Sequence, residues 1–144
     1  MPRIVMDTSI LVAGLRSRNG ASFAVLSRVA GRKVKALATT ALFLEYEAVL
    51  TRPENLKAAG ITALEAGEIL DALCDAGIEV QLTRRVRPRL RDPNDEMVLE
   101  TAVNGNATAI VTFNQRDFAD IARDFGILVL APSDVLKTLR IMIR

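Results

Sequence analysis

Acidic residues stand directly after two short apolar segments of the chain, where a sheet would present them to a ligand. Asp7 follows the segment 3–6, and Asp117 comes shortly after the segment 109–112. In open α/β sheets the ligand site lies beyond the carboxyl ends of the strands. Both positions also have a structural explanation, because Asp7 can cap a following helix and Asp117 can stabilise a helix that Asn114 caps. Position alone therefore leaves a structural and a chemical role open.

Glu45 lies in a segment whose apolar residues have helical spacing. Its neighbours three and four positions away on a helix are all apolar: Ala41, Leu42, Ala48 and Val49. An ionised carboxylate on a core-facing surface is costly unless it is paired or binds a cation. We therefore predict a functional role for Glu45, with a salt bridge to an arginine as the alternative.

Another group of polar residues crowds the start of an expected helix at Asp92-Pro93. Asp is a favoured N-cap, and Pro is a favoured first helical residue. Asp95 shares the buried face of this helix with apolar residues three, four and seven positions later, namely Val98, Leu99 and Ala102. Stabilisation of the helix dipole is the structural alternative. The acids that we expect to meet at one edge of the sheet are thus Asp7, Glu45, Asp95 and Asp117.

Clustered carboxylates favour one kind of chemistry in this chain. The sequence has no histidine and one cysteine, which excludes Ser-His-Asp and Cys-His catalysis, His-ligated zinc and an intramolecular disulfide. Carboxylate oxygens suit Mg²⁺ or Mn²⁺, and converging carboxylates without a cation raise one another's pKa. A cation held in this way activates water and neutralises charge on a phosphate. We therefore expect metal-dependent hydrolysis of a phosphodiester.

A second charged feature is a run of arginines: Arg84, Arg85, Arg87, Arg89 and Arg91. The whole chain has a net charge of only +2, so this positive charge is local. The run precedes the expected helix that carries Asp95, and Pro88 keeps it from being helical. One interpretation is a solvated surface loop. The other is that two or three of these arginines hold the phosphate backbone of an anionic partner beside the metal.

The rest of the sequence alternates short apolar segments with helical ones. Strands are expected over residues 3–6, 34–39, 78–82, 109–112 and 127–130. Helices are expected from Thr8, over 23–29, over 41–50 with a stop at Pro53, over 64–76, from Pro93 toward Gly105, over 115–125 and from about Ser133. This alternation predicts an α/β three-layer sandwich with a mainly parallel, about five-stranded central sheet. We see no repeat or linker, so residues 1–144 are expected to form a single domain.

The sequence also bears on the compartment. No apolar run reaches the roughly 20 residues that span a bilayer, so we expect no membrane segment. The N-terminus does not resemble a secretory signal, because only a few apolar residues precede Asp7. A chain with one cysteine has no disulfide framework, and we therefore expect a cytoplasmic protein.

Several short motifs occur in an order and at a spacing that resemble a PIN domain. They are Asp7-Thr8-Ser9, Glu45-Tyr46, Arg52-Pro53, Asp92-Pro93-Asn94-Asp95 and Val111-Thr112-Phe113-Asn114-Gln115-Arg116-Asp117-Phe118. The likeness extends from residue 3 to about residue 130. It is strongest to bacterial and archaeal PIN proteins of the VapC type, which are classed as toxin components of toxin–antitoxin pairs.

The resemblance implies a Mg²⁺- or Mn²⁺-dependent endoribonuclease whose parallel sheet lies between helices. It also implies RNA as substrate, frequent homodimers and an antitoxin partner that blocks the site. Apolar residues near the end of the chain would suit such a dimer, although they can equally cap the core: Leu136, Leu139, Ile141 and Ile143.

Motif position assigns roles within the resemblance. The three family acids correspond to Asp7, Glu45 and Asp95. Asp117 takes the fourth acidic position, which is more variable across the family. Thr112 matches the hydroxyl residue near the site, and Ser9 stands where many relatives have Asn. Some PIN nucleases have an acid where this chain has Asn114, so either Asn114 or Asp117 is expected to contact the metal.

Other functions fit part of the pattern. A haloacid-type phosphatase also begins with a strand and Asp, but it needs a second Asp where this chain has Ser9. A response-regulator receiver domain needs an Asp after its third strand, where Gln81-Leu82-Thr83 supplies none. A PIN-like fold that has lost catalysis and serves as an interaction module is the remaining alternative. Ribonuclease activity that requires Mn²⁺ would separate the enzyme from these binding functions.

Overall fold

Five short parallel strands form the centre of the structure, a computed structural model that describes residues 1–84 and 92–138. Their order across the sheet is β3-β2-β1-β4-β5. The bounds are β1 Arg3–Met6, β2 Lys35–Ala38, β3 Ile78–Glu79, β4 Ala109–Val111 and β5 Leu128–Leu130. In the central strand, Ile4 lies opposite Ala36 on one side and Ala109 on the other. Strand order reverses between β1 and β4, and such a switch point is where ligands bind in open α/β sheets.

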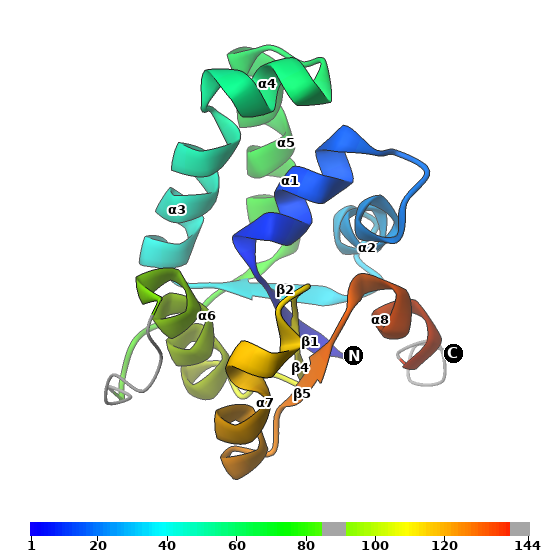
Figure 1. Ribbon diagram of the computed structural model, residues 1–144. Coiled ribbons are helices and arrows are strands. Elements are labelled where there is room, and N and C mark those ends of the chain that lie inside the picture. Colours follow the sequence, from blue (N-terminus) through cyan, green and yellow to red (C-terminus); the bar gives the residue numbers. More distant parts are fainter. Residues whose placement is uncertain (85–91, 139–144) are drawn as a thin grey trace.

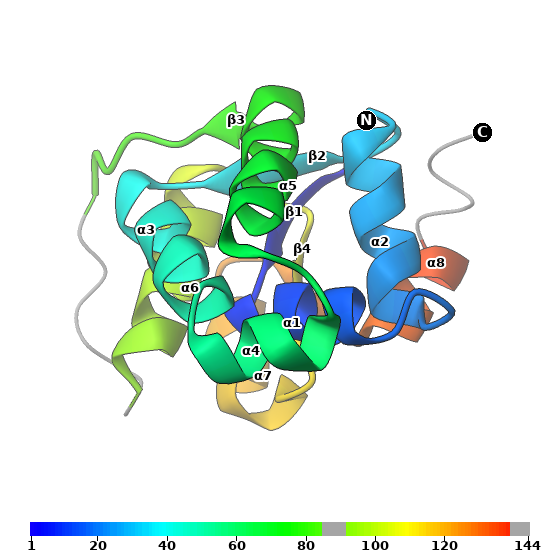
Figure 2. The ribbon, with the colours of Figure 1, turned by 90° about the horizontal axis from the view of Figure 1, so that it is seen from above.

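Helices cover both faces of this sheet (Figure 1). Their bounds are α1 Thr8–Arg16, α2 Ala21–Ala30, α3 Thr40–Leu50, α4 Pro53–Ala59, α5 Ala63–Ala76, α6 Pro93–Asn104, α7 Gln115–Asp124 and α8 Pro132–Thr138. In Figure 1, α1 to α5 lie above the sheet and α6 and α7 lie below it, while α8 packs beside α2. Figure 2 looks down on the first layer and shows α5 over β2 and β3. The predicted three-layer sandwich with a parallel sheet is confirmed.

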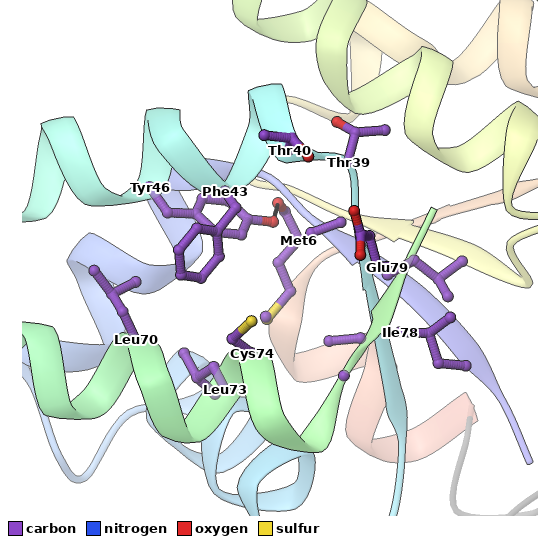
Figure 3. A pocket seen from close by; sticks show the side chains of 14 residues that line it. Met6, Thr39, Thr40, Phe43, Tyr46, Leu70, Leu73, Cys74, Ile78 and Glu79 are labelled. Carbon is purple, nitrogen blue, oxygen red and sulfur yellow. Dashed lines mark hydrogen bonds between the residues drawn. The ribbon is translucent and has the colours of Figure 1, made fainter. Parts of the chain in front are cut away.

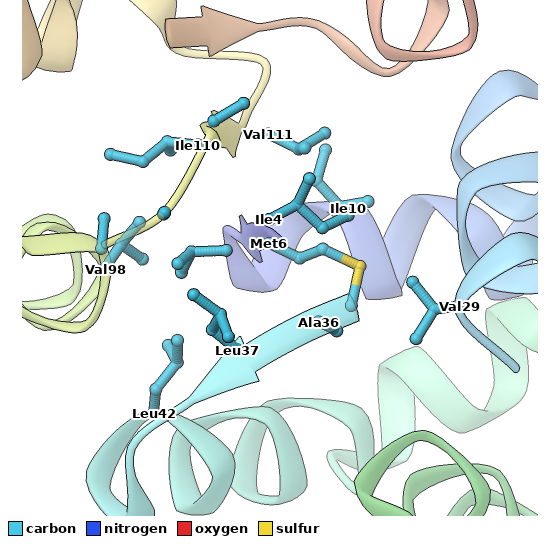
Figure 4. Close-up of a cluster of buried hydrophobic side chains, with 14 of the residues drawn as sticks. Ile4, Met6, Ile10, Val29, Ala36, Leu37, Leu42, Val98, Ile110 and Val111 are labelled. Atoms are coloured by element: carbon cyan, nitrogen blue, oxygen red, sulfur yellow. The ribbon is translucent and has the colours of Figure 1, made fainter. Parts of the chain in front are cut away.

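The core consists of apolar side chains from the strands and from both helical layers (Figure 4). Ile4 and Ile110 on the two central strands are fully buried, and Leu42 and Val98 approach them from α3 and α6. A strand covered on both faces has no exposed side, so its sequence does not alternate between apolar and polar residues. This explains why the strands are continuous apolar segments in the sequence.

The third strand is shorter than expected. We predicted a strand over residues 78–82, whereas β3 contains only Ile78–Glu79. It lies at the edge of the sheet and pairs with β2 alone. The Val80 N–H still donates to the Ala38 carbonyl oxygen at 2.9 Å, but β2 ends there because the chain enters α3. Beyond that point the edge strand has no backbone to pair with.

The short helix α4 is absent from the prediction. Pro53 ends the preceding helical segment, as expected, and it is also the first residue of α4. A proline is favoured at that position because its missing N–H would have no helical partner there. Among the described residues, no helix is long and apolar enough to cross a membrane.

Candidate active site

Asp7 lies at the carboxyl end of β1, directly beside the switch point of the sheet. Its side chain is 6 % exposed. Oδ2 accepts hydrogen bonds from the Thr112 hydroxyl at 2.9 Å and from the Ser9 hydroxyl at 3.2 Å. Asp7 is the N-cap residue of α1, but its side chain makes no capping hydrogen bond. Helix capping therefore does not explain this carboxylate, and two hydroxyl donors fix its orientation instead.

Asp95 lies in the first turn of α6 and is 7 % exposed, on the face that also carries Val98 and Leu99. The cap of this helix is supplied by Asp92, whose Oδ1 accepts the Asn94 N–H at 2.8 Å. The pKa of Asp95 is raised to about 6, most strongly by burial and then, in decreasing order, by the charges of Asp92, Asp7, Asp117 and Glu96. The fold therefore places several carboxylates close enough to repel one another.

Glu45 is half-buried on α3, and its surroundings differ from the prediction. The buried face of this helix consists of Leu42, Tyr46 and Leu50. Two of the apolar neighbours that suggested burial, Ala41 and Ala48, are exposed. Glu45 therefore lies at the flank of the buried face and lines a cavity together with Asp7 and Asp95. The residue reaches the expected place, but the argument from a core-facing stripe was wrong.

Tyr46, the next residue on α3, connects this helix to the site. Its hydroxyl donates to the main-chain carbonyl oxygen of Met6, which directly precedes Asp7. Figure 3 shows the Tyr46 side chain extending from α3 toward Met6. Burial raises the pKa of Tyr46, as does the negative charge of Asp7, so the hydroxyl keeps its proton. A buried tyrosine needs a partner for its O–H group, and here that partner fixes the helix of Glu45 against the end of β1.

The acids surround an open cavity of about 520 Å³. Asp7, Glu45, Asp92 and Asp95 line it, together with the polar side chains of Ser9, Asn94 and Asn114. Residues that the sequence analysis did not propose for the site also line it, among them Arg16, Asn55 and the aromatic Phe113. Phe113 is 53 % exposed although it is a large apolar side chain. Its position two residues after β4, within the motif that resembles a PIN domain, was the signal in the sequence.

Asp117 and Asn114 occupy different places relative to this cavity. Asn114 is the N-cap residue of α7 and lines the cavity, and its N–H donates to the Thr112 hydroxyl at 3.0 Å. Asp117 is exposed in the first turn of α7 and is not part of the cavity lining. Its charge nevertheless acts on Asp95. Asn114 thus shares the cavity with Asp7, while Asp117 acts on the acids through its negative charge.

The run of arginines is only partly described. Arg85, Arg87, Arg89 and Arg91 lie outside the described residues. Arg84 is exposed, and its main chain is held by Asn104, whose Oδ1 accepts the Arg84 N–H at 2.8 Å. Arg84 lines a different cavity, which is formed with α6 residues and Phe125 and includes none of the four acids. The expected RNA contact of this run therefore stays a prediction.

A divalent cation is the group that this set of donors would suit. Carboxylate oxygens are the ligands that Mg²⁺ and Mn²⁺ prefer, and repulsion among the acids would be relieved by a cation. Within the described ranges, however, no three acidic or cysteine side chains are grouped tightly enough to form a metal site. The hydroxyl of Thr8, a residue that lines the cavity, is buried without a hydrogen-bond partner among the described residues. The donor chemistry fits a metal, and its ligands would have to approach one another on binding.

A second cavity, of about 270 Å³, lies between α3, α5 and β2 (Figure 3). Its walls are mostly apolar and include Phe43, Leu70 and Ile78. None of the predicted site residues lines it. The polar chemistry of the molecule is therefore concentrated in the cavity around Asp7.

Comparison with curated proteins and with solved structures gives no significant match. A comparison with protein families gives one. The sequence profile of the PIN domain matches residues 3–116, which contain β1 to β4 and Asp7, Glu45 and Asp95. This match covers most of the chain, and the chain therefore belongs to the PIN domain family.

Proposed function

We propose that this chain is a Mg²⁺- or Mn²⁺-dependent endoribonuclease and the toxin of a toxin–antitoxin pair. PIN domains are generally nucleases and typically use divalent metal ions. The observation that carries the proposal is the shared cavity of Asp7, Glu45 and Asp95, where burial and then neighbouring negative charges raise the pKa of the Asp95 carboxyl group. Repulsion among clustered carboxylates lowers the stability of the fold, and a bound cation would relieve this repulsion.

In this proposal Asp7, Glu45 and Asp95 hold the metal. A bound ion would lower the pKa of a water molecule and neutralise charge on the phosphate. Thr112 and Ser9 orient Asp7, because both donate to its Oδ2. The other oxygen, Oδ1, accepts no hydrogen bond from the described residues and stays available to a ligand. Asp117 and Asn114 would act at the rim, one through its charge and the other through its amide.

RNA as substrate is supported by the shape of the site. The cavity is open and combines acids with arginine side chains and the exposed ring of Phe113. Unpaired bases stack on exposed aromatic rings, and arginines hold the phosphates between them. These features suit a single strand better than a duplex, whose bases are already stacked.

The toxin role and the partners rest on the motif resemblance described above. We propose an antitoxin that blocks the cavity, a homodimer, and action on RNA in the cytoplasm. Leu136, one of the four apolar residues expected at a dimer contact, packs partly buried against the core. The other three, Leu139, Ile141 and Ile143, lie outside the described residues. Growth arrest on induced expression, absent with Asp95→Asn, would separate a toxin from another ribonuclease.

The central test uses the purified chain, single-stranded RNA and either Mn²⁺ or a chelator. Asp95→Asn keeps the side-chain shape but removes the charge, so cleavage with Mn²⁺ should fall by orders of magnitude while thermal unfolding shows an intact fold. Asp71→Asn is the matched control, because Asp71 is an exposed acid on α5. Cleavage by Asp95→Asn at the wild-type rate would contradict the metal site. No cleavage by the wild type would favour the interaction module, and hydrolysis of a phosphate monoester alone would favour the phosphatase.

A further inference from the structure

Arg16, the last residue of α1, is held in a defined orientation beside the candidate active site. Its Nη2 donates to Asn55 Oδ1 at 3.1 Å. Asn55 is half-buried at α4, and its Nδ2 donates in turn to the Val49 carbonyl oxygen at 2.7 Å. Val49 lies one turn after Glu45 on α3. A relay of two hydrogen bonds therefore connects the guanidinium group to the helix that carries one of the candidate acids.

The charge of Arg16 is not neutralised by this arrangement. Its partner is a neutral amide, whereas Arg32 and Arg123 pair with carboxylates at 3.0 and 3.5 Å. Among the described residues, no acid lies within ion-pair distance of Arg16. Arg16 also lines the cavity, so its remaining N–H donors can bind a ligand there. Guanidinium groups bind phosphate through several such donors at once.

The cavity is also divided by charge. Asp7, Asp92 and Asp95 come from the end of β1 and the start of α6, and Glu45 comes from α3. The basic side chains Arg16 and Arg52 come from the end of α1 and from the residue before α4. Val12, Ala13 and Val49 lie in the wall between them. Asp7 directly precedes α1 and Arg16 ends it, so the two residues are separated by roughly 13 Å along the helix axis. The spacing of these two main-chain positions leaves room for two phosphates of one strand.

We propose that Arg16, oriented by Asn55, binds a backbone phosphate of single-stranded RNA that is different from the phosphate at the acids. The proposal rests on the proposed function, because it takes the substrate to be a nucleic acid strand. Arg52 lies at the same end of the cavity and adds positive charge there. The contact is to phosphate and carries no sequence information. It positions the strand so that another phosphodiester lies at Asp7, Glu45 and Asp95.

The test measures binding of a short fluorescent single-stranded RNA to the full chain in a chelator, where metal-dependent cleavage is absent. Arg16→Ala should weaken binding roughly fivefold to tenfold at low salt. Between about 50 and 200 mM salt, the slope of log affinity against log salt should be shallower for this variant by about 0.7. That difference corresponds to the loss of one contact with a single-strand phosphate. Arg28→Ala is the matched control: Arg28 is exposed on α2, has no carboxylate partner among the described residues and does not line the cavity. It should leave the slope unchanged.

Asn55→Ala tests the positioning role. It should weaken binding less than Arg16→Ala does, and it should have no further effect in an Arg16→Ala background. Additive effects of the two substitutions would contradict the relay, and equal salt slopes for Arg16→Ala and Arg28→Ala would overturn the phosphate contact. Absence of RNA binding by the wild type would overturn it as well.

Mn²⁺-dependent cleavage, measured in parallel, tests the proposed function separately: binding through Arg16 without cleavage would retain the phosphate site and reject the nuclease.

Discussion

Two hydroxyl groups share one oxygen of the Asp7 carboxylate, and this arrangement assigns a role to Thr112. The Thr112 side chain is fully buried, donates to Asp7 Oδ2 and accepts the Asn114 N–H. It thereby connects the end of β4 to the end of β1 and to the start of α7. Groups that hydrogen-bond to a metal ligand fix its orientation and strongly affect metal affinity.

At the residue scale we predict that Thr112→Val weakens Mn²⁺ binding roughly 10- to 100-fold. Valine has nearly the same shape as threonine but cannot donate to Asp7. Loss of the two hydrogen bonds should also lower the free energy of unfolding by about 1 to 2 kcal/mol. Calorimetric titration with Mn²⁺ measures the first effect and denaturant unfolding the second. Thr112→Ser, which keeps the hydroxyl, should restore most of the affinity. If the valine variant binds Mn²⁺ as tightly as the wild type, Thr112 does not act through Asp7.

Individual site residues were predictable to different degrees. The positions of Asp7 and Asp95 in the cavity could be predicted, because strand ends and helical periodicity place a side chain from local sequence. For Glu45 the place was right and the reason wrong, because flanking alanines do not reveal which face of a helix is buried. The contact between Arg16 and Asn55 joins residues 39 positions apart. Neither residue has a local signal, so this contact becomes visible only when α1 and α4 are placed in space.

At the scale of elements, two glycines of α5 and its end differ in how close they lie to the sheet. Gly77 ends α5, with an extended backbone at φ −92° that any residue can adopt. A Cβ at this position would lie 2.7 Å from the Ala36 carbonyl oxygen in β2. Gly67 lies within α5, and a Cβ there would have no heavy atom within 4 Å. The first glycine therefore permits a close approach of helix and strand, and the second has no such role.

These two positions give opposite expectations for the same substitution. Gly77→Ala should lower the free energy of unfolding by about 1 to 3 kcal/mol, because the clash is with main chain that cannot rotate away. Gly67→Ala should raise it by about 0.5 to 1 kcal/mol, since alanine loses less backbone entropy in a helix. Denaturant unfolding of both variants measures the difference. A Gly77→Ala variant as stable as the wild type would mean that α5 can shift away from β2.

The predictability of elements follows from the range of the interactions that form them. The parallel sandwich could be predicted because apolar segments and helix signals alternate, and both are local. The length of β3 could not, since it is set by where β2 ends. α4 was missed because Pro53 serves as both a stop and a start. Which end of the sheet collects the acids did follow from the sequence, because parallel strands present all their carboxyl ends at one edge.

At the scale of the whole molecule, the fold brings acids from β1, α3 and α6 to one cavity. Gathered carboxylates reduce folding stability whenever they are all ionised, and the cost is relieved by protons or by a cation. Asp95 shows the effect of this repulsion, because its pKa is raised to about 6, first by burial and then by the surrounding acids. In an unfolded chain an aspartate has a pKa of about 3.9. The folded chain therefore retains the Asp95 proton in a pH range where the unfolded chain has lost it.

The sign of the effect on stability follows from this difference. A pKa that is raised in the folded state stabilises the fold fully below the unfolded pKa, and this contribution is lost as the pH rises through the folded value. In a chelator, the free energy of unfolding of the wild type should thus fall between about pH 4 and pH 7, relative to that of Asp95→Asn. The difference should be at most roughly 3 kcal/mol, and smaller where water in the open cavity screens the charges. Denaturant unfolding across this pH range, with both proteins, measures it.

Above about pH 7, Mn²⁺ should restore stability to the wild type and much less to Asp95→Asn, because only the wild type has the full set of acids. Parallel pH profiles for the two proteins would contradict the crowding of charge around Asp95, and equal stabilisation by Mn²⁺ would place the ion elsewhere.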